Sequence, residues 1–288
     1  MRMKRTAAPS GERVKIIKEH YARHVRDEWK RLDTGAFHRL EFLTTMHFLK
    51  KAFPKRGLIL DAGGGPGRYT VALAGLGYDV VLVDFVERNL TFAKRQVRKA
   101  GLQARLAGAI NADITDLSRL PSNHFDGVVC LGGPLSHLLK RDDRNDAVGE
   151  LARVAKPGAP VLMSVMSKLS TVINEAATPR YQRELTMPFF SRYVRTGDYS
   201  GEAGFTAFHG FMRDELYDLA TRHGLAVLQI AGLEGTGHWA EDAFDRLERN
   251  EERWDVWLKT HYSICTEPSI ADLSAHMLAV CRKPSRRA

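Results

Sequence analysis

Along most of this chain, segments with apolar residues at helical intervals alternate with short apolar runs typical of strands. From about residue 11 to residue 53 they recur at helical intervals, with a break at DTG (33–35), which predicts two helices. Short apolar runs then alternate with further helical patterns, and several of these runs are apolar on both faces, as in parallel strands covered by helices. The clearest runs are LIL (58–60), DVVLVD (79–84), FDGVVCLG (125–132) and PVLMSVM (160–166). The pattern predicts an α/β fold around a mostly parallel sheet.

The alternation stops between about residues 167 and 208, where aromatic residues are mixed with glycines. Irregular stretches of this length usually form lids, binding loops or disordered segments, and the aromatic content disfavours disorder. The alternation resumes with a helix at 213–224, a strand at 225–233, one amphipathic helix at 241–262 and a last strand at 275–283. We therefore predict a single domain, with a helical lid (1–53), a sheet core (54–166 and 209–283) and a cap insertion (167–208).

The formal net charge of +9 is concentrated near the two ends of the chain. Residues 1–18 contribute +5 and residues 282–288 contribute +4, so the segment between them is formally neutral. A groove that follows nucleic-acid phosphates requires basic residues within the folded body. Solubilising tails are therefore favoured over an RNA- or DNA-binding arm, and nucleic acid is an unlikely partner.

The three cysteines, Cys130, Cys265 and Cys281, are an odd number without metal-type spacing. They indicate neither a disulfide framework nor a zinc site, and no metal ion is expected. No apolar run approaches the roughly 20 residues of a membrane span. We expect a cytoplasmic protein without a membrane partner, and the sequence leaves its oligomeric state open.

The stretch LILDAGGGPGRYT (58–70) leads from a predicted strand into a glycine-rich loop. Gly63, Gly65 and Gly67 would let main chain approach a ligand beyond the carboxyl end of the strand. A dinucleotide fingerprint starting at Gly63 would require glycine at position 68, which is Arg68, and the lysine of a phosphate-binding loop is also missing. The loop therefore suits a nucleoside without phosphates.

Two aspartates complete this predicted nucleoside site. Asp84 closes the second strand 21 positions after Gly63 and could accept hydrogen bonds from both ribose hydroxyls. In NADITDL (111–117), Asp113 could accept from an exocyclic amine while the main-chain NH of Ile114 faces a ring nitrogen. Together these residues predict a site for adenosine.

The four motifs LILDAGGGPG, VVLVD, NADITDL and FDGVVCLGGPLSHL resemble, in this order, those of the class I S-adenosylmethionine-dependent methyltransferase family. The resemblance spans about residues 20–282 and implies a Rossmann-like, doubly wound sheet of seven strands with the last antiparallel. More narrowly, the chain is similar to bacterial and archaeal small-molecule methyltransferases. The loop GGPLSH replaces the Asn-Pro-Pro-Tyr motif of nucleic-acid amine methyltransferases, which counts against a base as acceptor.

The resemblance also implies contacts for the cofactor, S-adenosylmethionine. Asp61 and the loop from Gly63 to Gly67 would lie near its methionine and ribose parts, and main chain around Leu131 would bind the methionine amine. Arg31 could pair with the methionine carboxylate, or it could be an ordinary surface arginine. The implied ribose and adenine contacts are Asp84 with the adjacent Phe85, and Asp113 with Ile114.

Methyl transfer from a sulfonium needs chiefly alignment, and holding two reactants in line supplies roughly 7 to 11 kcal/mol of barrier reduction. A general base adds about 3 to 5 kcal/mol. His137, on the loop after the fourth strand, and His209, before a later helix, are the candidate bases; either could instead have a structural role. We expect a methyltransferase acting on a small molecule. The alternatives are an RNA or protein methyltransferase that uses the basic tails and a non-catalytic cofactor-binding protein; the acceptor stays open.

Overall fold

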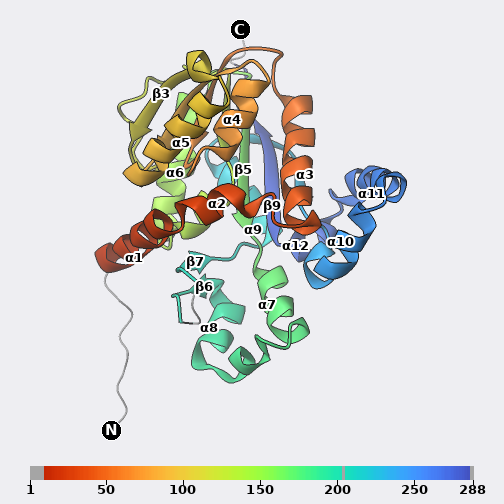
Figure 1. Cartoon of the computed structure of the whole chain (residues 1–288). Coiled ribbons are helices and arrows are strands. Elements are labelled where there is room, and N and C mark those ends of the chain that lie inside the picture. Colours follow the sequence, from red (N-terminus) through yellow and green to blue (C-terminus); the bar gives the residue numbers. More distant parts are fainter. Residues whose placement is uncertain (1–9, 203–204, 286–288) are drawn as a thin grey trace.

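The computed structural model describes residues 10–202 and 205–285 and forms a seven-stranded sheet between layers of helices (Figure 1). The strand order is β3-β2-β1-β4-β5-β9-β8, in which β1 to β5 pair in parallel and β9 is antiparallel to both neighbours. The strands are β1 (Leu58–Ala62), β2 (Asp79–Asp84), β3 (Leu106–Asn111), β4 (Gly127–Cys130), β5 (Pro160–Met166), β8 (Ala226–Gly232) and β9 (His276–Arg282). The predicted fold class is confirmed, including the antiparallel last strand.

Helices cover both faces of the sheet, so neighbouring residues of one strand belong to different cores. Ile59 and Val129 pack in one apolar cluster with helix α3 (Ala36–Ala52), whereas Leu60 and Val128 pack in the other with helix α6 (Arg141–Val154). This two-residue period explains why the central strands are apolar at nearly every position. The remaining helices of the body are α4 (Arg68–Gly75), α5 (Glu87–Lys99), α6 (Arg141–Val154), α9 (Arg213–Arg222) and α12 (Pro268–Leu273).

Between residue 10 and the first strand the structure has three helices, not the predicted two: α1 (Ser10–Arg23), α2 (Val25–Arg31) and α3 (Ala36–Ala52). The extra break is at His24, whose φ of −101° and ψ of 20° lie outside helical values. In Figure 1, α1 and α2 cross in front of the end of the sheet from which the cap projects, while α3 runs along the sheet. The basic residues Arg2, Lys4, Arg5, Arg286 and Arg287 lie outside the described residues.

The single helix predicted at 241–262 is also interrupted, giving α10 (Glu241–Glu248) and α11 (Glu251–Ile264). The side chain of Asn250 accepts a hydrogen bond from the main-chain NH of Arg253, so it starts a new helix at this point. The hydrophobic period continues across the break, which is why the pattern alone predicted one helix.

The segment 167–208 is more regular than its composition suggested. It contains α7 (Lys168–Ala177), α8 (Pro188–Thr196) and β6 (Asp198–Tyr199), which pairs with β7 (Phe208–His209). Phe189, Tyr193, Tyr199 and Phe208 form its own apolar cluster. We call residues 167–208 the cap; it projects from one end of the sheet (Figure 1).

Two further features bear on the sequence-based expectations. The three cysteines are buried and carry free thiols. Among the residues that the structure describes, no helix has both the length and the apolar character needed to cross a membrane. The cytoplasmic location stays a prediction.

Candidate functional site

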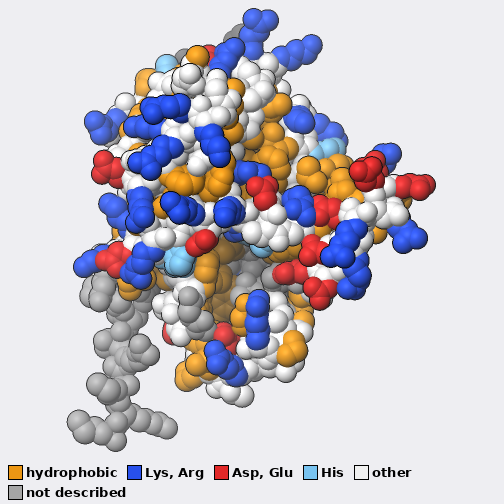
Figure 2. Space-filling model, viewed as in Figure 1, with side chains coloured by type: hydrophobic (Ala, Val, Ile, Leu, Met, Phe, Trp, Pro, Cys, Tyr) orange, Lys and Arg blue, Asp and Glu red, His pale blue; other side chains and the backbone are white. Residues whose placement is uncertain are grey.

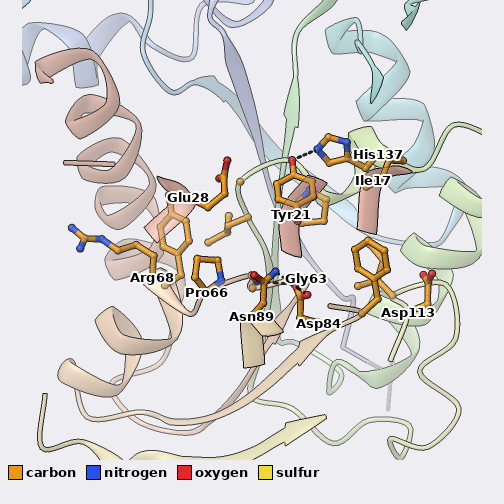
Figure 3. Close-up of a pocket in the computed structure, with 18 of the residues that line it drawn as sticks. Ile17, Tyr21, Glu28, Gly63, Pro66, Arg68, Asp84, Asn89, Asp113 and His137 are labelled. Carbon is orange, nitrogen blue, oxygen red and sulfur yellow. Dashed lines mark hydrogen bonds between the residues drawn. The ribbon is translucent and has the colours of Figure 1, made fainter. Parts of the chain in front are cut away.

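A pocket opens at the carboxyl ends of β1, β2 and β4, beneath α1 and α2. It encloses about 1010 Å³ of empty space, including the part open to solvent. In Figure 3, the side chains of Asp84 and Asn89 lie together beside Gly63, and those of Tyr21 and His137 lie together above them, joined by a dashed line.

The glycine loop lines the floor of the pocket. Gly63 and Gly65 have φ values of 70° and 55°, a region that favours glycine, and both line the pocket. Gly67 does not line it: this residue precedes α4, and a Cβ there would lie 2.7 Å from Ala93. Gly64, which the sequence analysis did not single out, is the tightest position, because a Cβ would lie 2.5 Å from Asp61 and Leu82.

Asp84 lines the pocket at the end of β2 and is almost completely buried. Its carboxylate accepts hydrogen bonds from the main-chain NH groups of Gly65 and Val86, both at 2.8 Å, and from the side-chain amide of Asn89 at 3.1 Å. Burial raises the pKa of Asp84 despite these bonds. Since a carboxylate offers about four lone-pair sites, one remains for a ligand hydroxyl, whereas the sequence led us to expect bonds to both ribose hydroxyls.

Asp61 lies beneath the loop and does not line the pocket. One of its oxygens accepts a hydrogen bond from Thr70 at 2.6 Å, and the other is buried without a partner. Burial raises the pKa of Asp61 to about 6. Its direct contacts therefore support the loop from below.

The residues predicted to contact adenine and the methionine amine do line this pocket: Phe85, Asp113, Ile114 and Leu131. One oxygen of Asp113 accepts hydrogen bonds from the main chain and side chain of Thr115. Its other oxygen accepts no hydrogen bond from the described residues, and the residue is exposed, so that oxygen is accessible to a ligand.

Arg31 lines the pocket but is not an ordinary surface arginine. Its guanidinium donates to both oxygens of the fully buried Glu41, at 2.5 and 3.0 Å, and lies 3.5 Å from Glu28. Burial alone would raise the pKa of Glu41, but Arg31 lowers it to about 2. The guanidinium of Arg31 therefore forms part of the pocket wall and is already ion-paired with Glu41.

His137 lines the pocket, and both of its ring nitrogens are occupied. Nε2 lies 2.5 Å from the hydroxyl of Tyr21 on α1, and Nδ1 lies 3.0 Å from the carbonyl oxygen of Ala207 at the end of the cap. Burial lowers the pKa of His137 to about 4. This histidine joins the lid to the cap and has no free nitrogen facing the pocket.

His209 does not line the pocket. Its Nδ1 lies 2.7 Å from Asp198 on β6, and its Nε2 lies 2.9 Å from Glu215 on α9. Burial alone would lower the pKa of His209, but these two carboxylates raise it. His209 thus connects the cap to the body and lies outside the pocket in which the reaction is predicted.

The electrostatics of the lining favour a cationic ligand. The lining acids are Glu28, Asp84 and Asp113. The two lining cations are already paired, Arg31 with both Glu41 and Glu28 and Arg68 with Asp33, so acids still outnumber cations. Unbalanced negative charge in a partly buried pocket attracts cations and disfavours phosphates. A phosphate-free nucleoside that carries a positive charge is complementary to this lining. The glycine loop, which has no room for a Cβ at Gly64, lets main chain approach such a ligand.

One group of described residues could hold a metal ion, with ligand atoms of Glu41, Glu234 and His276 within 4.8 Å of one another. Their carboxylates already accept hydrogen bonds, Glu41 from Arg31 and Glu234 from His276 and Ser274. The group is therefore saturated by protein donors. The absence of a metal ion stays a prediction.

Sequence reasoning missed Glu28, Gly64 and Asn89. Glu28 lies three positions before Arg31, a helical spacing that places both side chains on one face. Asn89 lies five positions after Asp84, at the start of α5, but nothing in the sequence marks it as a partner of the carboxylate. Gly64 was passed over because the prediction followed the alternate spacing of Gly63, Gly65 and Gly67.

Residues 59–158 match a family model described as "Methyltransferase domain". A glycine/sarcosine N-methyltransferase of Parasynechococcus marenigrum is 32% identical over 139 residues, 48% of either chain. The chain thus spans about half the length of this curated relative. A ubiquinone/menaquinone biosynthesis C-methyltransferase of Pseudomonas paraeruginosa is 28% identical over 191 residues, which is 65% of this chain and 71% of that protein.

Among solved structures, the fold is similar to a Burkholderia thailandensis 1,6-didemethyltoxoflavin-N1-methyltransferase with bound S-adenosylhomocysteine. The TM-score is 0.59 and the identity is 15%, with coverage of 98% of this chain and 94% of that one. At this identity the similarity concerns the fold. It extends beyond the matched domain to nearly the whole chain.

Proposed function

Because this chain belongs to the class I S-adenosylmethionine-dependent methyltransferase family, we propose that it transfers a methyl group from S-adenosylmethionine to a small-molecule acceptor. The proposed cofactor contacts are Asp61, Gly63, Gly65, Gly67, Asp84, Phe85, Asp113, Ile114, Leu131 and Arg31. Of these, Asp61 and Gly67 act indirectly, since neither lines the pocket.

The observation that carries the proposal is the position of Asp84 beside the glycine loop, with Gly65 donating to it at 2.8 Å. This contact links the carboxyl ends of β1 and β2, and α/β proteins bind nucleotides at the carboxyl ends of their strands. The acidic lining complements a sulfonium and would repel a pyrophosphate. Both features are properties of the protein's own residues.

The bound cofactor supplies an electrophilic methyl group, so the protein's task is to align an acceptor and exclude water. Helices α1 and α2 cover the pocket, and the cap meets α1 at His137. In the face drawn in Figure 2, the surface is hollowed between the body and the cap. We propose that the acceptor enters through this hollow and that alignment supplies most of the rate enhancement.

The two candidate bases have different hydrogen-bond partners, and we propose different roles for them. His209 lies in the cap–body junction, bonded to Asp198 and Glu215, so it is proposed as a structural residue. His137 is retained, but its Nε2 is occupied by Tyr21, so a proton could reach it only through that hydroxyl or after the lid opens.

Calorimetric titration with S-adenosylhomocysteine tests the cofactor site. Asp84→Ala removes a charged acceptor and should weaken binding about 10- to 100-fold. The matched control is Asp79→Ala at the other end of β2, where the carboxylate is half-exposed and pairs with Arg105. Equal affinity of Asp84→Ala and wild type would remove Asp84 from the site.

A cofactor-binding role without methyl transfer is the alternative that the fold itself allows. Two matched fungal proteins are named S-adenosyl-L-methionine-dependent Diels-Alderases. Incubating metabolite fractions with methyl-labelled cofactor separates the two roles. Label should appear in a small molecule; retention of all label in the cofactor, with binding intact, would favour the alternative.

A further inference from the structure

The hydrogen-bond directions between Tyr21, His137 and Ala207 are fixed by elementary chemistry. A carbonyl oxygen only accepts, so the 3.0 Å contact with Ala207 requires a proton on Nδ1 of His137. In a neutral imidazole the other nitrogen then carries a lone pair. The 2.5 Å contact must therefore be a hydrogen bond donated by the Tyr21 hydroxyl to Nε2.

Burial keeps this arrangement neutral. It lowers the pKa of His137 to about 4 and raises the pKa of Tyr21. Near neutral pH, neither the imidazolium nor the phenolate is populated. The direction of the hydrogen bond is thus maintained over the physiological range.

The consequence concerns the side of Tyr21 that faces the pocket. Its only hydroxyl proton is held by His137, so its oxygen presents lone pairs alone to a ligand. The apolar Ile17 also lines the pocket, and Glu28 is the charged lining residue whose carboxylate most raises the pKa of Tyr21. Figure 3 shows Tyr21 across the pocket from Asp84, on the side where the loop after β4 carries His137.

We propose that Tyr21, positioned by His137, is the contact for a hydrogen-bond donor at the transfer end of the pocket, namely the N–H or O–H of the methyl acceptor. This inference rests on the proposed function and adds the acceptor's chemical class. An amine or hydroxyl compound that carries a hydrogen satisfies the oxygen of Tyr21. A tertiary amine or a thioether does not, because it has no donor.

The test uses two cofactor analogues and needs no known acceptor. S-adenosylhomocysteine has no donor at the transfer end, whereas sinefungin carries a protonated amine where the cofactor has its methylated sulfur. Both are titrated by calorimetry against wild type, Tyr21→Phe and the control Tyr78→Phe. Tyr78 is also buried, and its hydroxyl donates to the carbonyl of Pro54 outside the pocket.

Tyr21→Phe should weaken sinefungin about 10-fold or more relative to S-adenosylhomocysteine, since hydrogen bonds to charged groups contribute roughly 1.5 to 3 kcal/mol. Tyr78→Phe should leave the ratio unchanged. A purely structural role of Tyr21 would weaken both analogues equally, and that result would overturn the inference. Wild type that binds neither analogue would instead overturn the proposed function.

The positioning role of His137 has its own readouts. His137→Gln should lower the sinefungin preference as Tyr21→Phe does. Nitrogen-15 NMR of the wild-type imidazole should show a proton on Nδ1, and Tyr21→Phe should shift the Nε2 resonance. A proton found on Nε2, or a preference unchanged in His137→Gln, would contradict the assignment.

Discussion

The two sides of the pocket are held together by contacts of very different range. In the glycine-loop half, residues 58–89, Asp84 bonds to residues 19, 2 and 5 positions away, and Asp61 bonds to Thr70, 9 positions away. In the lid-and-cap half, comprising α1, α2, the loop at 131–138 and the cap, Tyr21 and His137 are 116 positions apart. His137 and Ala207 are separated by 70.

This difference separates the contacts around Asp84 and the glycine loop from the closure of the lid, although Arg31 and Leu131, two proposed cofactor contacts, belong to the lid-and-cap half. The glycine-loop half needs only two strands, one turn and the start of one helix, so it forms whenever the sheet forms. The lid-and-cap half requires segments that are distant in sequence to meet, and such regions open more readily than the core. We therefore expect variants that damage one half while sparing the other.

The largest effect is expected from Gly64→Ala in the glycine-loop half. The new Cβ would lie 2.5 Å from Asp61 and Leu82, both buried, so the loop must move. Overpacking of this kind costs about 1 to 3 kcal/mol, and affinity for S-adenosylhomocysteine should fall roughly 10- to 100-fold. Gly75→Ala in α4, where a Cβ meets nothing closer than 4.0 Å, is the matched control. Unchanged affinity in Gly64→Ala would refute the tight fit of this loop.

An intermediate effect is expected from Gly210→Ala, next to the cap. Its Cβ would collide with the Tyr193 hydroxyl and lie 3.0 Å from the Cα of Lys168. Limited proteolysis should cut the cap about 10-fold faster, while affinity for S-adenosylhomocysteine changes less than about 3-fold. Equal damage to both properties would show that the two halves are not independent.

The smallest effect is a pH dependence at His209. Its folded pKa lies above the ordinary 6.5, so its stabilising contribution is complete below that pH and is lost as the pH rises through the folded value. His209 lowers the pKa values of Asp198 and Glu215, whose contributions are lost in acid, below their ordinary values of 3.8 and 4.5. The junction should be strongest between about pH 4.5 and 6.5.

Hydrogen exchange of the cap in wild type and His209→Gln measures this effect. The expected difference near pH 5.5 is about 1 kcal/mol, since both carboxylates are partly exposed and screened. It should shrink as the pH rises through the raised pKa of His209, where this residue loses its charge. Arg144, which lies 3.7 Å from Glu215, is present in both proteins and cancels in the comparison. A difference that grows toward alkaline pH would contradict the charge assignment.

The same contrast explains what the sequence could predict. The sequence pattern shows where β1, β2 and β3 end. The glycine loop, Asp84 and Asp113 lie at or just after these ends, so the strands fix their positions. The fold class followed from the same alternation. The helix breaks at His24 and Asn250 were missed because one is a local change of backbone angles and the other a side-chain cap inside a continuous hydrophobic period.

The contacts of the histidines could not be predicted, because they depend on pairs that only tertiary structure brings together. His137 and His209 look equivalent in sequence, each on a loop near the carboxyl end of the sheet. The structure puts His137 against Tyr21 in the pocket and His209 between two carboxylates outside it. Arg31 was likewise ambiguous until Glu41, ten positions later, was seen to face it.

The place of β9 in the strand order has a consequence for synthesis on the ribosome. β8 is an edge strand attached to the sheet through β9, and β9 ends at Arg282. The first five strands can pair as they emerge, but β8 must wait beside them without a partner until the last strand is released. A nascent chain therefore carries an unfinished sheet edge at β5 from the synthesis of that strand until β9 is released, and that edge is where a chaperone would have the most to protect.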